Sequence, residues 1–506
     1  MQRRTFLTAS LGLALADQLP GQRAPKFNDN PFKLGVASGD PMPRGFVLWT
    51  RLISPSLSAP VPSSPIKVNW IVAKDDQCRN VVKRGSAIAA PELAHSVHVE
   101  VDGLAPNRDY WYRFSVGGEE SPIGRTRTAP AFGNDLDRLT FAFASCQSYE
   151  DGLYTAHEHL AKENVELVVF LGDYIYENGP KAGASPRKHD APEIFTLSDY
   201  RRRYELYKSD PFLQRSHAAA PWIVTWDDHE VDNDYAGDHQ ENNHPRDKFL
   251  ERRASGYQAY YEHMPLRLAQ KHSGSSLQLY RTVRYGKLAA FQVLDTRQYR
   301  DPQPCGGGGF TGACPDAASG DILGDTQTKW LLDALDKSWS KWNVMAQQVP
   351  FAKRVTVSGQ PPNQSVGENM DKWGGYLASR RAVTEFLAKR KPENPVVITG
   401  DVHTNWAFDI HEDGDRGPIL ASEFVGTSIS SSGDGSDRQP ITDRLYSENP
   451  HLKFFNGQRG YVKCTVDAKV WRTEYRVVPY ISKPGAPIST RETFVLESGR
   501  AGIHRA

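Results

Sequence analysis

Hydrophobic and polar positions follow two different rhythms along this chain, with one change between them. Between residues 32 and 130, short alternating segments such as 67–72 and 96–101 are separated by Gly, Pro and Asn. Alternation with a period of two predicts strands, and evenly spaced short strands are typical of an antiparallel sandwich. We therefore predict a leader at 1–30, followed by a small all-β sandwich domain at 31–130.

Beyond that point, apolar segments of strand length alternate with polar stretches of helix length. This alternation predicts a layered α/β domain, which we place at 135–506. The predicted elements are a helix at 153–163 and strands at 139–144, 167–171, 222–226, 289–294 and 395–399.

Chemically reactive side chains follow directly after four of these predicted strands. In open α/β sheets, ligands bind beyond the carboxyl ends of the strands, where successive loops converge. Carboxylates brought together there repel one another unless a cation compensates them. A simple turn or a helix cap explains any one of these positions, but not all four together. We therefore predict a multi-metal site with ligands from the strand ends at 145–147, 172–177, 226–230 and 400–403, where His229 and His403 offer neutral imidazoles.

The overall composition narrows the possible partners. With 61 Lys+Arg against 60 Asp+Glu, the 506-residue chain has a net charge of +1, which excludes general attraction to nucleic acid or an anionic membrane. Aromatic residues at 10% and charged residues at 24% exclude a mainly disordered chain. We interpret the arginine runs 201–203 and 252–253 as solvated helix faces. We expect no stable nucleic-acid partner, and we expect a monomer.

The N-terminus has the pattern of an export signal. Arg3-Arg4 is followed by Phe6-Leu7 and then by the short apolar run 8–16. This pattern resembles a twin-arginine signal, so we expect the twin-arginine export machinery as a partner and a periplasmic or secreted protein. A frayed basic terminus is the alternative. The apolar run is too short to span a bilayer, and no later segment is long enough, so we expect no transmembrane segment.

Five cysteines are too few for a disulfide scaffold. Cys305 and Cys314 flank a glycine-rich loop that can bring two sulfur atoms together. An oxidising compartment favours a disulfide between them, and a pair of metal-binding thiols is the alternative. Cys78 and Cys464 are expected to be small core residues.

Four motifs at the predicted strand ends carry a family resemblance: Ser-Cys-Gln at 145–147, Gly-Asp-Tyr-Ile-Tyr-Glu at 172–177, Trp-Asp-Asp-His-Glu at 226–230 and Gly-Asp-Val-His at 400–403. Together they resemble the alkaline phosphatase D family. Further matching motifs extend from 32–41 through 294–300 to 459–462, so the resemblance covers nearly the whole chain. It implies a fibronectin type III-like β-sandwich, followed by a calcineurin-like α/β metallophosphatase domain with four α/β/β/α layers.

The resemblance also implies a ferric ion (Fe3+) bound on one side of the site. By analogy with purple acid phosphatases, Asp173 bridges two metals and Tyr176 binds iron as a phenolate. Cys146 stands where the purple enzymes have an aspartate, and it binds iron as a thiolate. His403 completes the iron side. Sulfur, phenolate and imidazole are ligands that suit iron.

Calcium (Ca2+) is implied on the other side. Asp228 stands at the position of an asparagine in the purple enzymes, and Asp401 replaces the first histidine of their Gly-His-x-His motif. Oxygen ligands suit calcium, so the chemistry of these residues agrees with the family resemblance. Asn233 and Asp234 are further candidates on this side.

The implied activity is that of an alkaline phosphatase, which releases inorganic phosphate from small-molecule phosphate esters. A metal-bound hydroxide would attack phosphorus in line, with Asp173 and His229 as the catalytic residues. His229 is a candidate donor to the phosphate or the leaving group, and a purely structural hydrogen bond is its alternative. A phosphodiesterase or phospholipase D acting on diesters is the nearest rival function. A non-catalytic extracytoplasmic binding protein is a rival of another class.

Two further segments have open interpretations. Asp295 and Arg297 follow a predicted strand, and Arg297 is a candidate for binding phosphate or for a structural ion pair. Residues 371–376 (Asp-Lys-Trp-Gly-Gly-Tyr) form either a cleft wall or part of the core.

Overall fold

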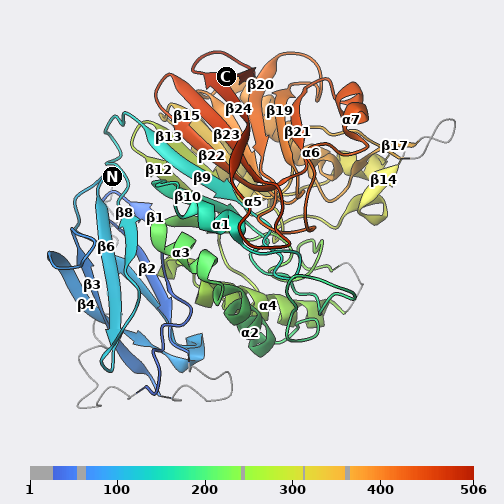
Figure 1. Cartoon of the computed structure of the whole chain (residues 1–506). Helices are drawn as coiled ribbons and strands as arrows, with labels where there is room; N and C mark the ends of the chain where they lie inside the picture. Colours follow the sequence, from blue (N-terminus) through green and yellow to red (C-terminus); the bar gives the residue numbers. More distant parts are fainter. Residues whose placement is uncertain (1–26, 54–63, 241–244, 312–313, 359–364) are drawn as a thin grey trace, which may run out of the picture.

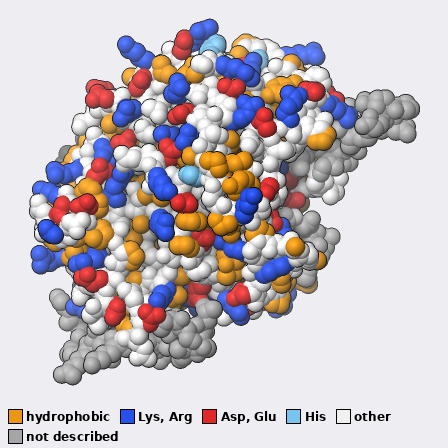
Figure 2. Space-filling view, viewed as in Figure 1, with side chains coloured by type: hydrophobic (Ala, Val, Ile, Leu, Met, Phe, Trp, Pro, Cys, Tyr) orange, Lys and Arg blue, Asp and Glu red, His pale blue; other side chains and the backbone are white. Residues whose placement is uncertain are grey.

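The computed structural model describes residues 27–53, 64–240, 245–311, 314–358 and 365–506 (Figure 1). The expected twin-arginine signal lies outside the described residues. None of the described helices is long and apolar enough to cross a membrane. On the face drawn in Figure 2, basic and acidic side chains are interspersed.

A ten-stranded sheet runs through the whole molecule. Its central strands are parallel, and β22 and β1 extend it on the two sides. In spatial order it contains β25 (His504–Arg505), β24 (Ser489–Glu497), β23 (Val470–Val478), β22 (Arg459–Val466), β9 (Leu139–Ala144), β10 (Leu167–Leu171), β11 (Trp222–Thr225), β1 (Val36–Met42), β2 (Gly45–Arg51) and β5 (Ser96–Val101).

A seven-stranded sheet packs against one face of the first sheet. Phe141, Val169 and Ile223 point into this interface from the ten-stranded sheet, and Phe291 and Ile398 meet them from the other side. In spatial order the second sheet contains β12 (Arg281–Tyr285), β13 (Ala289–Val293), β15 (Trp342–Ala346), β18 (Pro395–Thr399), β20 (Ile419–Val425), β19 (Asn405–His411) and β21 (Leu452–Asn456).

Helices cover the two outer faces of this pair of sheets. Alternate residues of the ten-stranded sheet, such as Ala142 and Phe170, pack against α1 (Thr155–Leu160), α2 (Leu197–Lys208), α3 (Pro211–Ala219) and α4 (Arg246–His263). The outer face of the seven-stranded sheet packs against α5 (Gly324–Asp336), α6 (Leu377–Arg390) and α7 (Thr442–Glu448). The predicted four-layered α/β/β/α fold is therefore confirmed.

The N-terminal sandwich shares a sheet with the rest of the molecule (Figure 1). Strands β1, β2 and β5 form one of its two layers, and they are also the edge of the ten-stranded sheet. The junction is the parallel pairing of Gly39 with Trp222, where a Cβ on residue 39 would lie 2.6 Å from the Pro265 carbonyl oxygen. The other layer contains β4 (Val81–Ala89), β3 (Ile66–Ala73), β6 (Asp109–Val116), β7 (Glu119–Glu120) and β8 (Gly124–Arg127).

A small three-stranded sheet projects from the C-terminal half (Figure 1). Cys305 and Cys314 form the expected disulfide next to it. Cys78, Cys146 and Cys464 are free and buried. The small sheet contains β14 (Gly309–Thr311), β17 (Ser365–Asn369) and β16 (Thr356–Ser358).

Candidate metal centre

The side chains predicted from the strand ends meet at one edge of the two central sheets. Strands β9, β10 and β11 are parallel and in register, so the residues after each of them emerge side by side. Strand β18 delivers Asp401 and His403 from the facing sheet. The structure thus brings together all six predicted ligands and His229.

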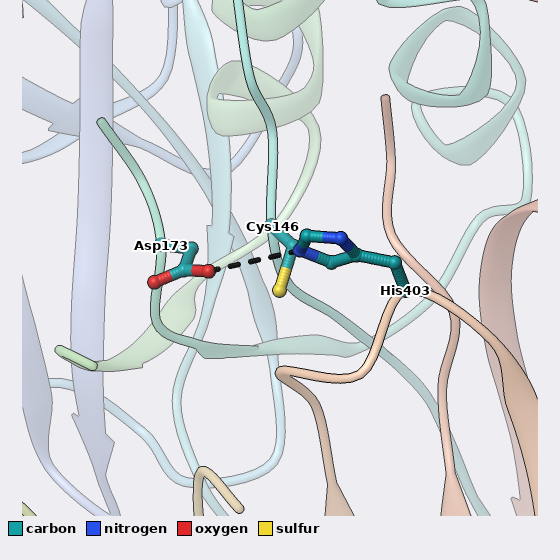
Figure 3. A group of neighbouring side chains, drawn as sticks. All are labelled: Cys146, Asp173 and His403. Atoms are coloured by element: carbon teal, nitrogen blue, oxygen red, sulfur yellow. Dashed lines mark ion pairs between the residues drawn. The ribbon is translucent and has the colours of Figure 1, made fainter. Parts of the chain in front are cut away.

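Cys146, Asp173 and His403 form the first group of potential ligands (Figure 3). One ligand atom from each lies within 4.8 Å of the other two, and Asp173 Oδ2 is 4.0 Å from His403 Nε2. The hydroxyl of Tyr176 lies 3.0 Å from Asp173 Oδ2 and 3.2 Å from His403 Nε2. We call Cys146, Asp173, Tyr176 and His403 the cysteine side of the site.

Two further groups continue from Asp173. Asp173, Asp228 and His229 form one of them, and Asp227, Asp228 and Asp401 form the other, each with ligand atoms within 4.8 Å. Asp173 is therefore common to the cysteine-containing group and to a second group. We call Asp227, Asp228, Asp401 and the nearby Asp371 the carboxylate side.

Four of the six predicted ligands have left-handed backbone conformations. The φ angles are +58° at Cys146, +56° at Asp173, +66° at Asp401 and +53° at His403. Residues other than glycine rarely adopt positive φ, and such conformations cluster at functional sites because the surrounding structure must hold them in place. No feature of the sequence pattern predicts these positive φ angles.

Glu230 holds two of the strand-end loops together. Its buried carboxylate accepts hydrogen bonds from the backbone N–H groups of Asp173 (3.2 Å), Tyr174 and Asp227 (2.8 Å). Burial raises the pKa of Glu230 to about 8, against the effect of these hydrogen bonds. A Cβ at Gly172 would lie 2.5 Å from the Asp227 Cβ, so only glycine allows the two loops this close.

The cysteine side fits a bound cation. Burial, together with the neighbouring negative charges, raises the pKa values of Cys146, Asp173 and Tyr176 well above their ordinary values. The buried Asp173 Oδ1 accepts no hydrogen bond from the described residues. Burial lowers the pKa of His403 to about 3, which keeps its imidazole neutral and able to bind a metal. A cation would compensate the acidic groups and occupy the unpaired oxygen.

The carboxylate side already contains cationic side chains. Arg297 is fully buried, forms an ion pair with Asp227, and lies 2.7 Å from Asp371 and 3.4 Å from Asp401. These contacts support a structural ion pair for Arg297 and not the binding of phosphate. We expected bound cations alone to compensate Asp173, Asp228 and Asp401, but Arg297 lies 3.5 Å from Asp228 and 3.4 Å from Asp401 and compensates part of their charge.

Residues 371–376 divide between the site and the core. Lys372 Nζ lies 2.8 Å from Asp371 Oδ2 and also forms an ion pair with Asp401. Burial opposes its charge, but Asp371 and Asp401 outweigh this and raise the pKa of Lys372 above its ordinary value. Trp373 and Tyr376 are buried in the hydrophobic core between the seven-stranded sheet and its helices.

His229 lies at the rim of the site, paired with an acid. Its Nδ1 is 2.7 Å from Glu177 Oε2, and 14% of its side chain is exposed. Burial opposes protonation, but Glu177, Asp228 and Asp173 outweigh it and raise the pKa of His229 well above its ordinary value. The acids around it thus favour the protonated imidazole, and solvent can reach this side chain. The same glutamate accepts the backbone N–H of Asn233, and the Asp234 N–H donates to Asp228.

A serine-containing loop supports the cysteine side, although the sequence alone identifies it only as a loop. The Ser431 hydroxyl is 2.6 Å from Tyr176 Oη, and the Ser432 hydroxyl is 2.8 Å from His403 Nδ1. Backbone N–H groups of this loop also donate to the Cys146 carbonyl oxygen. The run of serines in the sequence indicates a loop, but it does not indicate which strand end this loop approaches.

Comparisons with known proteins agree with this architecture. The family model described as "PhoD-like phosphatase" matches residues 141–475, and "PhoD-like phosphatase, N-terminal domain" matches residues 16–130. Alkaline phosphatase D of Bacillus subtilis (strain 168) is 48% identical over 510 residues, which cover 98% of this chain and 86% of that protein. A solved structure of PhoD superposes with a TM-score of 0.92 at 48% identity, covering 95% of this chain and 93% of that one.

Proposed function

This chain belongs to the PhoD-like phosphatase family, and from that premise we propose that it is a metal-dependent alkaline phosphatase acting on small phosphate esters. The observation that carries the proposal is the meeting of two ligand groups at Asp173. One group offers sulfur and imidazole beside a phenol. The other offers Asp228 and His229, and Asp228 also belongs to the all-carboxylate group with Asp227 and Asp401. A non-catalytic binding protein has no need for such a set.

We assign the cysteine side to Fe3+ and the carboxylate side to Ca2+. Cys146, Tyr176 and His403 supply the thiolate, phenolate and imidazole ligands that suit iron, and Asp228 and Asp401 supply the oxygen ligands that calcium prefers. We assign Asp173 as a ligand of both cations. When bound, such cations would polarise a phosphate ester, lower the pKa of a coordinated water and neutralise the leaving oxygen.

The remaining chemistry belongs to the protein's own residues. His229 is partly exposed and its Nδ1 faces Glu177, so we assign it the role of hydrogen-bond donor to the phosphate or the leaving-group oxygen. Glu177 fixes the orientation of the imidazole through Nδ1. Glu230 holds the loop that contains Asp173 close to the loop that contains Asp227.

An activity panel tests the proposal. A phosphate monoester, a diester and a phospholipid are offered at alkaline pH, with calcium present or chelated, and the iron content is measured alongside. We expect monoester hydrolysis that needs calcium in a protein containing iron. Faster cleavage of the diester or the phospholipid would replace the assignment with that of a phosphodiesterase or phospholipase D. Hydrolysis of none of them by metal-loaded protein would overturn the enzyme assignment.

We further propose that the protein is exported through the twin-arginine machinery to the periplasm or the medium, and that it acts as a monomer. The proposal rests on Arg3-Arg4 and the apolar run behind them. Fractionation of a bacterial host expressing the full chain, with and without a functional twin-arginine translocase, tests the route. Export that persists without the translocase contradicts it.

A further inference from the structure

Two cationic side chains lie among the carboxylates of the site, and they are held very differently. Arg297 has no exposed surface, and its guanidinium contacts Asp227, Asp371 and Asp401. Removing it would leave several buried charges unpaired, so it is a fixed part of the site. Lys372 is 16% exposed and contacts Asp371 and Asp401 alone among the described acidic side chains.

The position of Lys372 coincides with the place where a cation would bind. Asp401 is one of three carboxylates whose oxygens lie within 4.8 Å of one another. The ammonium group of Lys372 reaches Asp401 Oδ2, while Arg297 approaches Oδ1 of the same carboxylate. A cation at this group and the lysine ammonium therefore compete for Asp401. Lysine is a point charge on a flexible stem, so it can withdraw toward Asp371 or solvent, whereas the forked arginine is held at several atoms.

We propose that Lys372 is a built-in counter-ion of the carboxylate side, which occupies Asp401 in the absence of calcium and is displaced when calcium binds. The inference rests on the proposed assignment of Asp401 to calcium. It has two consequences. Lys372 weakens calcium binding, because each calcium ion must first break the ion pair with Asp401. It also lets the carboxylate side fold before calcium is present, because one of its charges is already compensated.

Calcium binding by purified protein tests both consequences without reference to catalysis. Wild type, Lys372→Met, Lys372→Arg and Lys463→Met are freed of calcium with a calcium-selective chelator, and calcium is titrated calorimetrically. Melting temperatures are measured with chelator and with saturating calcium. Lys463→Met is the matched control, because Lys463 is also mostly buried, at 22% exposure. Its ammonium group lies 2.7 Å from Glu163, which is not one of the candidate ligands.

The two methionine variants should separate clearly. Loss of a charge a few ångströms from the ion should tighten calcium binding by Lys372→Met at least about tenfold. Its melting temperature should fall below that of wild type in chelator, and calcium should raise it by more than it raises wild type. Lys372→Arg should bind calcium no more tightly than wild type, because it keeps the positive charge and withdraws less readily. Lys463→Met should bind calcium as wild type does, whatever its stability.

Unchanged or weaker calcium binding by Lys372→Met, with wild type still binding calcium, overturns the role of Lys372 and leaves the proposed function standing. If neither wild type nor any variant binds calcium in iron-containing protein, the calcium assignment falls and this inference falls with it. Should Lys372→Met not be recovered folded, Lys372→Gln takes its place, since it also removes the charge but keeps a polar end.

Discussion

The cysteine side and the carboxylate side of the site solve the same problem of buried negative charge in different ways. On the carboxylate side, Arg297 and Lys372 form ion pairs with the acidic side chains. On the cysteine side, Asp173 forms no ion pair with a lysine or arginine among the described residues, and the phenol of Tyr176 contacts the uncharged Ser431 hydroxyl. The cysteine side therefore depends on a bound cation for its charge balance, while the carboxylate side is partly balanced by the protein itself.

Asp173→Asn should have the largest effect, because this carboxylate belongs to both ligand groups. We expect the content of iron and of calcium to fall together and phosphatase activity to drop by about 10³-fold or more, which corresponds to several kcal/mol of lost stabilisation. Elemental analysis and steady-state kinetics measure both. Asp409→Asn is the control, since Asp409 is equally buried but pairs with Lys453 at 2.9 Å. A variant that loses only one metal would show that Asp173 is not shared.

Arg297→Met addresses the carboxylate side alone. Removing the guanidinium leaves Asp227 and Asp371 as buried charges without their main partner, so we expect a loss of about 3–5 kcal/mol in the free energy of unfolding. Urea denaturation with and without calcium measures it, and calcium should restore part of the loss. Arg390→Met, which breaks a surface pair with Asp336, should cost at most about 1 kcal/mol. Equal losses in the two variants would contradict the distinction between fixed and surface pairs.

Cys146→Asp addresses the cysteine side alone. An aspartate tolerates the left-handed φ of +58° at this position and offers an oxygen in place of sulfur. We expect iron to remain bound, absorption from thiolate-to-iron charge transfer to disappear, and activity to fall by about tenfold, or ~1.4 kcal/mol in the barrier. Calcium affinity should stay at the wild-type value. Cys146→Val, which is β-branched and offers no ligand, should lose iron. An unchanged visible spectrum in the aspartate variant would remove Cys146 from the iron site.

Local patterns in the sequence predict the strands that carry the site. The predicted segments 139–144, 167–171 and 395–399 coincide with β9, β10 and β18, because a run of buried residues between turn signals fixes both ends of a strand. Strand ends of parallel strands converge by geometry alone, so the meeting of Cys146 and Asp173 could be foreseen.

Contacts made by loops could not be foreseen in this way. Lys372 and Ser431 reach the site from loops far along the chain, and no periodic pattern relates such loops to a particular strand end. The same holds for the join between the N-terminal sandwich and the main sheet, which depends on one glycine at position 39. In both cases tertiary packing, and not local propensity, decides the arrangement.

Ser431→Ala should give the smallest effect, yet it tests how the cysteine side is supported. The Ser431 hydroxyl accepts the backbone N–H of Ser148 at 3.0 Å and lies 2.6 Å from Tyr176 Oη. Because the tyrosine donates its one proton to Asp173, the serine is the donor between the two hydroxyl groups. A donor aimed at this oxygen stabilises the phenolate that binds iron.

Without that donor, we expect the phenolate-to-iron absorption band to shift and activity to fall by up to about tenfold, the lower range for a group that orients a metal ligand. Ser431→Thr should restore both. Ser430→Ala is the matched control from the same loop, because the Ser430 hydroxyl donates to the Ser148 carbonyl at 2.8 Å instead. A band that shifts equally in both alanine variants would mean that the loop acts through its packing and not through the Ser431 hydrogen bond. The cysteine side would then be supported by shape alone.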